Sequence, residues 1–216
     1  MGDAIVSYGV GAEEYLARGR RRLAEGSAEA LFYAAFELRC GIEARMQEYL
    51  EARQEILRKK RHGYQIAKLA RGLERVFAGG DKIVELLIFE SDGTPRQQLY
   101  FTPVRSSLRR GAAKLGDLLH ARPTQLGEDH RWWGEQRALL EEMANELGLA
   151  CFGTLMGPPL LEKATGRMSI VVRTVSDDPL RLTAQIGHNV VMKVSYLDTV
   201  PEEMLKAAER RGTNFG

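Results

Sequence analysis

One amphipathic pattern limits most strongly what this chain can fold into. Between positions 31 and 49, apolar residues recur at steps of three or four, which predicts a long helix with one inward face. That face consists of Leu31, Ala34, Ala35, Leu38, Ile42, Met46 and Tyr49. Ser27 after Gly26 predicts the N-cap of this helix, and Gly63 is expected to end it. A helix this long and apolar is expected to be the centre of a helical array.

The residues around this helix predict a helical first third and then a change of character. Shorter helices are expected over 12–25 and 64–77, so the N-terminal part is an antiparallel helical array. From Lys82 the residues alternate, and an Asp-Gly turn at position 92 predicts a β-hairpin over 82–104. A further helix should follow and reach about His120.

The C-terminal part combines one long helix with short alternating segments. A helix is predicted over 128–149, followed by a loop rich in glycine and proline and, at the end of the chain, a helix from Pro201 to Arg210. Between them, three alternating runs predict an antiparallel β-meander over 167–175, 180–187 and 190–197. The fold class is therefore α+β, with a helical domain over 1–121 that contains the hairpin and an α+β region over 122–216. The meander is expected to share one antiparallel sheet with the hairpin.

Composition excludes several classes of protein. In 216 residues with a formal net charge of +2, no stretch approaches the roughly 20 apolar residues of a membrane span, and the first residues lack a secretory pattern. We therefore expect a cytoplasmic protein with no membrane partner. Cys40 and Cys151 lack the spacing of a disulfide framework or a zinc site and are expected to be buried thiols. No phosphate-binding glycine loop and no nucleophile elbow is present, so neither a cofactor nor a metal is expected.

Basic residues are concentrated in two stretches. Seven fall between positions 53 and 71, and five fall between Asp92 and Asp117 with no acid among them. The candidates for contact with nucleic acid are Arg58, Lys59, Lys60, Arg61, Arg105, Arg109 and Arg110. A phosphate-bearing partner would explain such a surface, but charge runs are also typical of solvated helix faces. Both interpretations stay open from the sequence.

Two charged residues fall on the apolar side of the long helix. Arg39 and Glu43 lie within an arc that also holds Phe32, Phe36 and Met46. At a spacing of four residues they can form an ion pair on one face. Such a pair near the core is retained for register or for a site, and we interpret it as structural.

The helical part resembles a known family. The residues from Tyr33 to Glu43 read Tyr-Ala-Ala-Phe-Glu-Leu-Arg-Cys-Gly-Ile-Glu, with alanine, arginine and glutamate four residues apart, and Lys114-Leu-Gly-Asp-Leu-Leu-His120 follows later. Over roughly residues 12–121 the chain resembles the HEPN-like domains (higher eukaryotes and prokaryotes nucleotide-binding). Their closing helix carries arginine, four to six residues and then histidine, often with Gly-Asn before the histidine. This chain has Lys114 in place of that arginine, Asp117 in place of that asparagine, and the hairpin as an insertion.

The resemblance implies a site and a function. An active family member uses the arginine and histidine of paired subunits to cleave RNA without a metal, which marks His120 and Lys114 as catalytic candidates and predicts a homodimer. Histidine supplies a general acid or base near neutral pH, whereas lysine replaces the two-pronged guanidinium by a point charge. We therefore expect an RNA- or nucleotide-binding module, non-catalytic or a weak metal-independent endoribonuclease, with a role in bacterial stress or defence. The alternative is a structural, oligomer-forming protein that does not bind nucleic acid.

Overall fold

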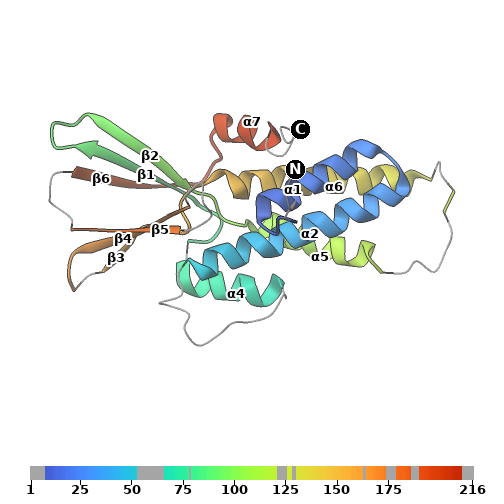
Figure 1. The fold of residues 1–216 in the computed structure, drawn as a ribbon, viewed down its shortest axis with the longest axis horizontal. Helices are drawn as coiled ribbons and strands as arrows, with labels where there is room; N and C mark the ends of the chain where they lie inside the picture. Colours follow the sequence, from blue (N-terminus) through green and yellow to red (C-terminus); the bar gives the residue numbers. More distant parts are fainter. Residues whose placement is uncertain are drawn as a thin grey trace, which may run out of the picture.

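The computed structural model describes residues 8–52, 66–77, 79–120, 126–127, 130–162, 164–173, 179–185 and 190–210. Helices gather at one end of the molecule and two small sheets at the other (Figure 1). The helices are α1 (Ala12–Glu25), α2 (Ala28–Glu51), α4 (Ile66–Phe77), α5 (Ser106–Leu118), α6 (Arg131–Phe152) and α7 (Glu202–Arg210). None of the helices in the described part of the chain is long and apolar enough to cross a membrane.

The predicted start of the long helix is correct in detail. Gly26 adopts a left-handed conformation with φ of 80° and ends α1, which lets the chain reverse into α2. The Ser27 hydroxyl then accepts a hydrogen bond from the backbone N–H of Ala30 at 3.1 Å. This bond satisfies one of the N–H groups that a helix start leaves without a partner.

In the described part of the chain, six strands form two antiparallel sheets, so the predicted α+β class is confirmed. The strands are β1 (Ile83–Glu90), β2 (Pro95–Phe101), β3 (Leu160–Glu162), β4 (Arg167–Arg173), β5 (Pro179–Gln185) and β6 (Val190–Leu197). The first sheet has the order β2-β1-β6 and the second has the order β3-β4-β5. Only the last strand of the predicted meander therefore joins the hairpin sheet, while β4 and β5 form the second sheet with β3.

The reason for this division lies in the side chains that face each other on β1 and β6. Met192 lies opposite Ile88 and Val194 lies opposite Leu86, and Leu86 and Ile88 are both buried. Pairing β6 with β1 therefore places apolar side chains of both strands on one face of the sheet, where they bury each other. A sequence pattern shows that β6 alternates but does not show which neighbour it will join.

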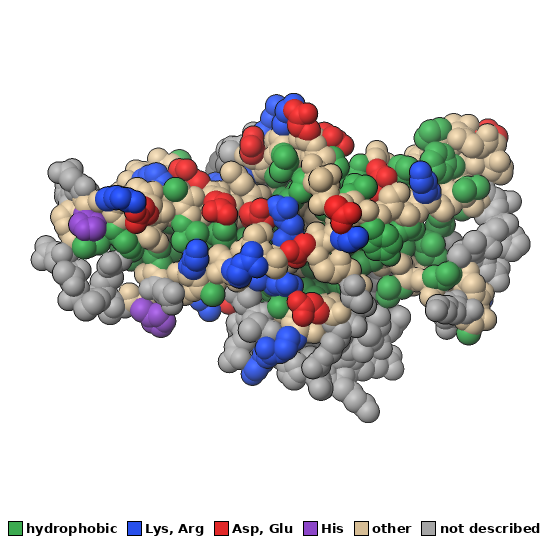
Figure 2. Space-filling model, turned by 180° about the vertical axis from the view of Figure 1, so that it is seen from behind, with side chains coloured by type: hydrophobic (Ala, Val, Ile, Leu, Met, Phe, Trp, Pro, Cys, Tyr) green, Lys and Arg blue, Asp and Glu red, His purple; other side chains and the backbone are tan. Residues whose placement is uncertain are grey.

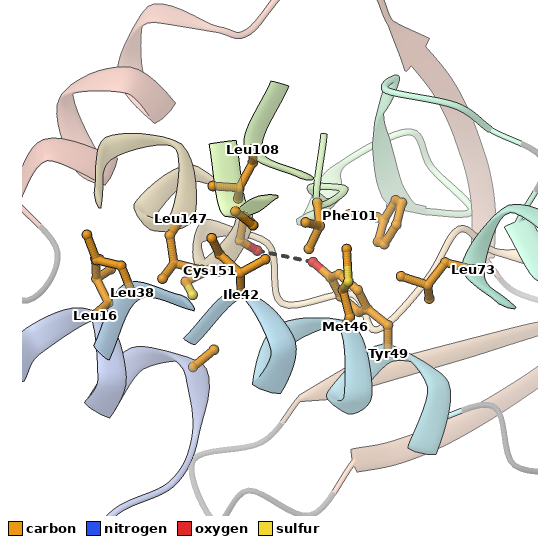
Figure 3. Packing of buried hydrophobic residues seen from close by; sticks show 14 of the residues in the cluster. Leu16, Leu38, Ile42, Met46, Tyr49, Leu73, Phe101, Leu108, Leu147 and Cys151 are labelled. Carbon is orange, nitrogen blue, oxygen red and sulfur yellow. Dashed lines mark hydrogen bonds between the residues drawn. The ribbon is translucent and has the colours of Figure 1, made fainter. Parts of the chain in front are cut away.

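One hydrophobic cluster unites the helices with both sheets. It draws residues from α1, α2, α4, α5 and α6 and from strands β1, β2 and β4. Figure 3 shows part of it, with Ile42, Met46 and Tyr49 of α2 packed among residues of the other helices. The cluster thus contains residues from both predicted domains, 1–121 and 122–216. The predicted boundary between 121 and 122 lies outside the described residues.

Helix α2 has neighbours from its own chain around most of its circumference. Helices α1, α4, α5 and α6 all pack against it. Phe32 meets the ring of Trp133 edge-on, with 6.1 Å between ring centroids. Tyr33 and Phe36 remain about half-exposed, at 50% and 51%. Much of the apolar surface of α2 is therefore covered within the chain.

Candidate nucleic-acid interface

Two of the predicted nucleic-acid-binding residues, Arg105 and Arg109, form ion pairs with carboxylates of neighbouring helices. The Arg105 guanidinium binds Glu146 of α6 through both carboxylate oxygens, with 3.1 Å between Nε and Oε2. Arg109 of α5 lies with its Nη2 atom 3.1 Å from Oε1 of Glu74 on α4. These arginines tie α5 to its neighbours on two sides, and their charges are already matched by carboxylates.

Two other basic residues of α5 have a different environment. Arg110 and Lys114 are exposed, lie one turn apart on α5, and form no ion pair with a described carboxylate. Lys68 and Arg71 on the adjacent helix α4 are likewise exposed and without an ion pair in the described part. We refer to Lys68, Arg71, Arg110 and Lys114 as the α4/α5 cations.

Positive and negative side chains are mixed over the face of the molecule that Figure 2 shows. Figure 2 shows Lys and Arg side chains interspersed with Asp and Glu side chains over the described part of one face. Unmatched positive charge in the described part is therefore local to groups such as the α4/α5 cations. The predicted residues Arg58, Lys59, Lys60 and Arg61 lie outside the described residues, and their role stays a prediction.

The two catalytic candidates lie at the same end of α5 but do not form a joined pair. Lys114 is exposed within the helix, and His120 is exposed two residues after the helix ends at Leu118. No hydrogen bond links either side chain to another described residue. General acid–base catalysis needs a histidine held in a fixed orientation, usually by a second group. The described residues do not supply that group for His120.

Arg39 of α2 places its guanidinium beside α5, the helix that carries Lys114. Arg39 and Glu43 form the predicted pair, with 3.4 Å between Nε and Oε1, but the Arg39 side chain is 34% exposed. The guanidinium of Arg39 lies against Gly116, where a side chain would collide with it, and Gly116 is four residues before His120. The pair is less buried than the helical wheel predicts, because Phe36 on the same arc is itself half-exposed.

Burial still affects the acid of this pair. It raises the pKa of the Glu43 carboxyl, and the nearby Arg39 acts in the opposite direction without fully offsetting it. The pair therefore does not gain the large stabilisation of a fully compensated buried ion pair. The Arg39 side chain is exposed enough to interact with an anion beside α5.

The polar residue at the centre of the molecule is one that the sequence patterns did not single out. Arg45 is fully buried, and its Nε donates to the carbonyl of Ala150 at 2.9 Å. Its Nη2 donates to the carbonyl of Gly153 at 2.8 Å, and its Nη1 lies 2.8 Å from Oε2 of Glu48. The last carbonyls of a helix have no partner within the helix and carry partial negative charge. Arg45 therefore caps the C-terminal end of α6.

Two further side chains contact the C-terminal end of α6. The Tyr49 hydroxyl donates to the carbonyl of Thr102 at 2.5 Å and also lies 3.1 Å from the carbonyl oxygen of Ala150. The Thr102 hydroxyl donates to the carbonyl of Ala150 at 2.9 Å. Figure 3 shows the Tyr49 hydroxyl hydrogen-bonded inside the hydrophobic cluster. Helix α2, the end of β2 and the end of α6 thus meet at one carbonyl group. We call Arg45, Glu48, Tyr49, Thr102 and Gly153 the α6 junction.

Arginine side chains also donate hydrogen bonds to carbonyls at the ends of two other helices. Arg20 donates to the carbonyls of Ala208 and Glu209 at the end of α7, at 2.6 and 2.7 Å. Arg137 donates to the carbonyls of Leu23 and Gly26 at the end of α1, at 3.0 and 2.8 Å. Three arginines are therefore used for the fold, which reduces the number of cations that a ligand could meet.

Cysteine and metal chemistry find no support in the described residues. Burial raises the pKa of the Cys151 thiol to about 12, so it is protonated at neutral pH and a poor nucleophile. Cys40 is only half-buried, unlike the prediction, and burial also raises its pKa. Within the described part of the chain, no cluster of three or more histidine, cysteine, aspartate or glutamate side chains could hold a metal ion.

Comparison with known proteins adds no relative to these observations. No family model matches the chain, and no curated protein or solved structure is similar to it. The HEPN-like resemblance therefore rests on the sequence motifs alone and stays a prediction.

Proposed function

We propose that this chain is a HEPN-like module that binds RNA or a nucleotide and has little or no catalytic activity. The observation that carries the proposal is the set of α4/α5 cations, which are exposed and unmatched by described carboxylates. In contrast, Arg105 directly before α5 and Arg109 on α5 are matched. Cations without a protein partner are the groups that phosphates recruit, with release of counterions. A role in bacterial stress or defence is part of the proposal through the family resemblance.

Weak catalysis is proposed because the parts of a nuclease site are incomplete. His120 lacks an orienting hydrogen bond from a described residue, and Lys114 cannot grip two phosphate oxygens as a guanidinium does. Arg39 lies beside Gly116 and could stabilise a phosphate next to His120, but its charge is shared with Glu43. These features favour binding over turnover.

Removing two of the α4/α5 cations is expected to weaken binding of single-stranded RNA. The wild type should bind a mixed-sequence RNA with an affinity that falls as salt increases. If Arg110 and Lys114 each contact a phosphate, the Arg110→Ala/Lys114→Ala variant should lower the slope of log affinity against log salt by about 1.4, which is roughly 0.7 for each phosphate contact. Fluorescence anisotropy between low and physiological salt measures this slope.

The control is a lysine on another helix, α7. Helix α7 lies far from α5 in Figure 1, and Lys206 on α7 is exposed and pairs with Glu202. Lys206→Ala removes one positive charge but should leave the slope unchanged. If only net charge matters, Lys206→Ala should lower the slope by about half as much as the double variant, because it removes one charge instead of two. An absence of RNA binding at low salt would remove the proposal.

Any RNA cleavage is expected to be slow, dependent on His120 and insensitive to EDTA. His120→Ala should abolish it, whereas Lys114→Arg should raise it because a guanidinium can contact two phosphate oxygens. Digestion of a mixed RNA substrate by the three proteins, with and without EDTA, measures these effects. Equal traces in all three would indicate a contaminant and end the nuclease interpretation, and loss of activity in EDTA would contradict a metal-independent reaction.

The second candidate function is an oligomer-forming protein without nucleic-acid binding. It is favoured by the exposed apolar side chains, which include Tyr33 and Phe36 on α2 and Val191 and Tyr196 on β6. The two candidates separate in the RNA assay, because a purely structural protein shows no salt-dependent affinity for RNA. A homodimer is compatible with both.

A further inference from the structure

The edges of the two sheets differ in how well they are protected against pairing with another strand. On the β2 edge, Pro95 lacks a backbone N–H, and the register with β1 shifts between Ile88 and Phe89, which leaves the charged Arg96 without an opposite residue. In the second sheet β3 has only three residues. Proline, bulges, charges and short length are the devices by which proteins prevent edge-to-edge association.

Strand β6 carries almost none of these devices. All eight of its residues pair with β1 in an unbroken register, and it contains no proline and one charged residue, Lys193. Its other side has no partner among the described strands. A long, regular edge with little charge is the kind that recruits a further strand.

The side chains along β6 also leave apolar surface exposed beside the open edge. Val191 is 58% exposed and Tyr196 is 53% exposed. Residues of odd and even number point to opposite faces of a strand, so these two lie on different faces of the sheet. A strand added at this edge would cover apolar area on both faces.

We propose that β6 pairs in an antiparallel sense with β6 of a second copy of this chain, so that the two three-stranded sheets become one six-stranded sheet. A two-fold axis perpendicular to the sheet relates the copies, and each copy closes the open edge of the other. This inference is independent of RNA binding. It places the contact on β6 and not on α2, where the family resemblance would put it.

The charge on β6 selects one register. In an antiparallel pair, opposite residues lie on the same face, so the axis must pass through a residue position. An axis at Lys193 would place this charge directly opposite its own copy, which is destabilising. An axis at Val194 avoids that contact and pairs residues 191 to 197, whereas an axis at Ser195 pairs only 193 to 197. The favoured register therefore has its axis at Val194.

This register makes complementary contacts across the axis. Lys193 lies opposite the second copy's Ser195, on one face. Met192 lies opposite the second copy's Tyr196 on the other face, which is an aromatic–aliphatic pair of the kind that stabilises sheets. Val191 lies opposite the second copy's Leu197. The second copy is the favoured occupant because its own β6 is an equally long and regular edge with no proline and a single charge, so each strand offers what the other requires.

A single lysine tests the register without threatening the fold. Ser195 lies opposite Glu85 on β1, so Ser195→Lys places a positive charge beside a carboxylate within its own chain. Across the proposed axis, however, the new lysine faces Lys193 in two symmetric positions. Light scattering should give about 48 kDa for the wild type, twice the 24.2 kDa of one chain, and the dissociation constant of Ser195→Lys should rise about tenfold or more.

Two further variants make the result specific. Lys193→Glu combined with Ser195→Lys places opposite charges across the axis and should restore the dimer. Gln97→Lys adds the same charge at an exposed position of β2, the other edge of the same sheet, and should leave the dimer unchanged. If Ser195→Lys lowers the melting temperature, Val191→Lys tests the same edge in another way, because it places a charge opposite the second copy's Leu197 and should also weaken the dimer.

The outcomes decide the proposal. A wild-type mass of about 24 kDa at micromolar concentrations overturns it and would leave the edge for another partner. A dimer that survives Ser195→Lys also overturns it and would direct attention to Tyr33 and Phe36 on α2. Weakening by Ser195→Lys, rescue by Lys193→Glu and indifference to Gln97→Lys together support the β6 pairing.

Discussion

Replacing Arg45 by methionine is expected to lower the free energy of unfolding by about 3 to 5 kcal/mol. Arg45 is fully buried and donates to the carbonyls of Ala150 and Gly153 and to the Glu48 carboxylate. Methionine has a similar length, so the loss should report these contacts more than an empty cavity. The Gly153 carbonyl would have no donor from this side chain, and Glu48 would lose its closest counter-charge. Urea unfolding monitored by circular dichroism measures the effect.

The matched control is another arginine of the same helix. Arg39 also forms an ion pair on α2, but its side chain is 34% exposed and its pair spans 3.4 Å. Arg39→Met should therefore cost less than about 1 kcal/mol. Adding Glu48→Gln to Arg45→Met should recover part of the loss, because it removes a partly buried carboxylate that has lost its closest counter-charge. Equal losses for the two arginine variants would contradict this account.

Local periodicity explains why the helices could be predicted from the sequence. The inward residues of α2 and its N-cap Ser27 lie close together in the sequence, so the local pattern predicts where the helix starts and which face is buried. Its end was not predicted: α2 ends at Glu51 and not at Gly63, which lies outside the described residues. The hairpin of β1 and β2 is equally local, since a short turn at Gly93 joins its strands. The α+β class follows from such local elements.

Contacts between distant segments could not be predicted in the same way. The acceptors of Arg45 are carbonyls about 105 residues away in the sequence, at Ala150 and Gly153. Backbone carbonyls occur at every residue and leave no mark in a sequence pattern. The helical array was predicted, but the residue that joins α2 to the end of α6 became visible only with the fold.

The candidate interface shows the same limit. Arg105, Arg109, Arg110 and Lys114 form one basic stretch in the sequence, and nothing in that stretch distinguishes them. Glu146 and Glu74 lie 41 and 35 residues away, on α6 and α4, and match the first two. The sequence predicted a basic helix correctly. Only the packing of the neighbouring helices shows which of its basic residues pair with carboxylates and which stay available to a ligand.

Replacing Gly153 by alanine is expected to cost about 3 kcal/mol, because the α6 junction leaves no room for a methyl group. Gly153 has φ of −69°, which any residue can adopt, so the backbone itself does not require glycine. The added Cβ atom would lie 2.6 Å from the carbonyl oxygen of Tyr100 and 2.8 Å from the backbone nitrogen of Thr102. Both are backbone atoms of the chain at the end of β2, so relief requires α6 and β2 to separate. Urea unfolding measures the loss.

Gly134→Ala provides the control within the same helix. No atom lies within 4 Å of the position where its Cβ would be, and alanine favours the helix over glycine by up to about 1 kcal/mol, so stability should rise. A Gly153→Ala variant as stable as the wild type would show that the junction tolerates separation. Gly153→Ala and Arg45→Met disturb the same contacts, since Arg45 donates to the Gly153 carbonyl at 2.8 Å. The double variant should therefore lose less stability than the sum of the two single losses, whereas simple additivity would show that the two residues act independently.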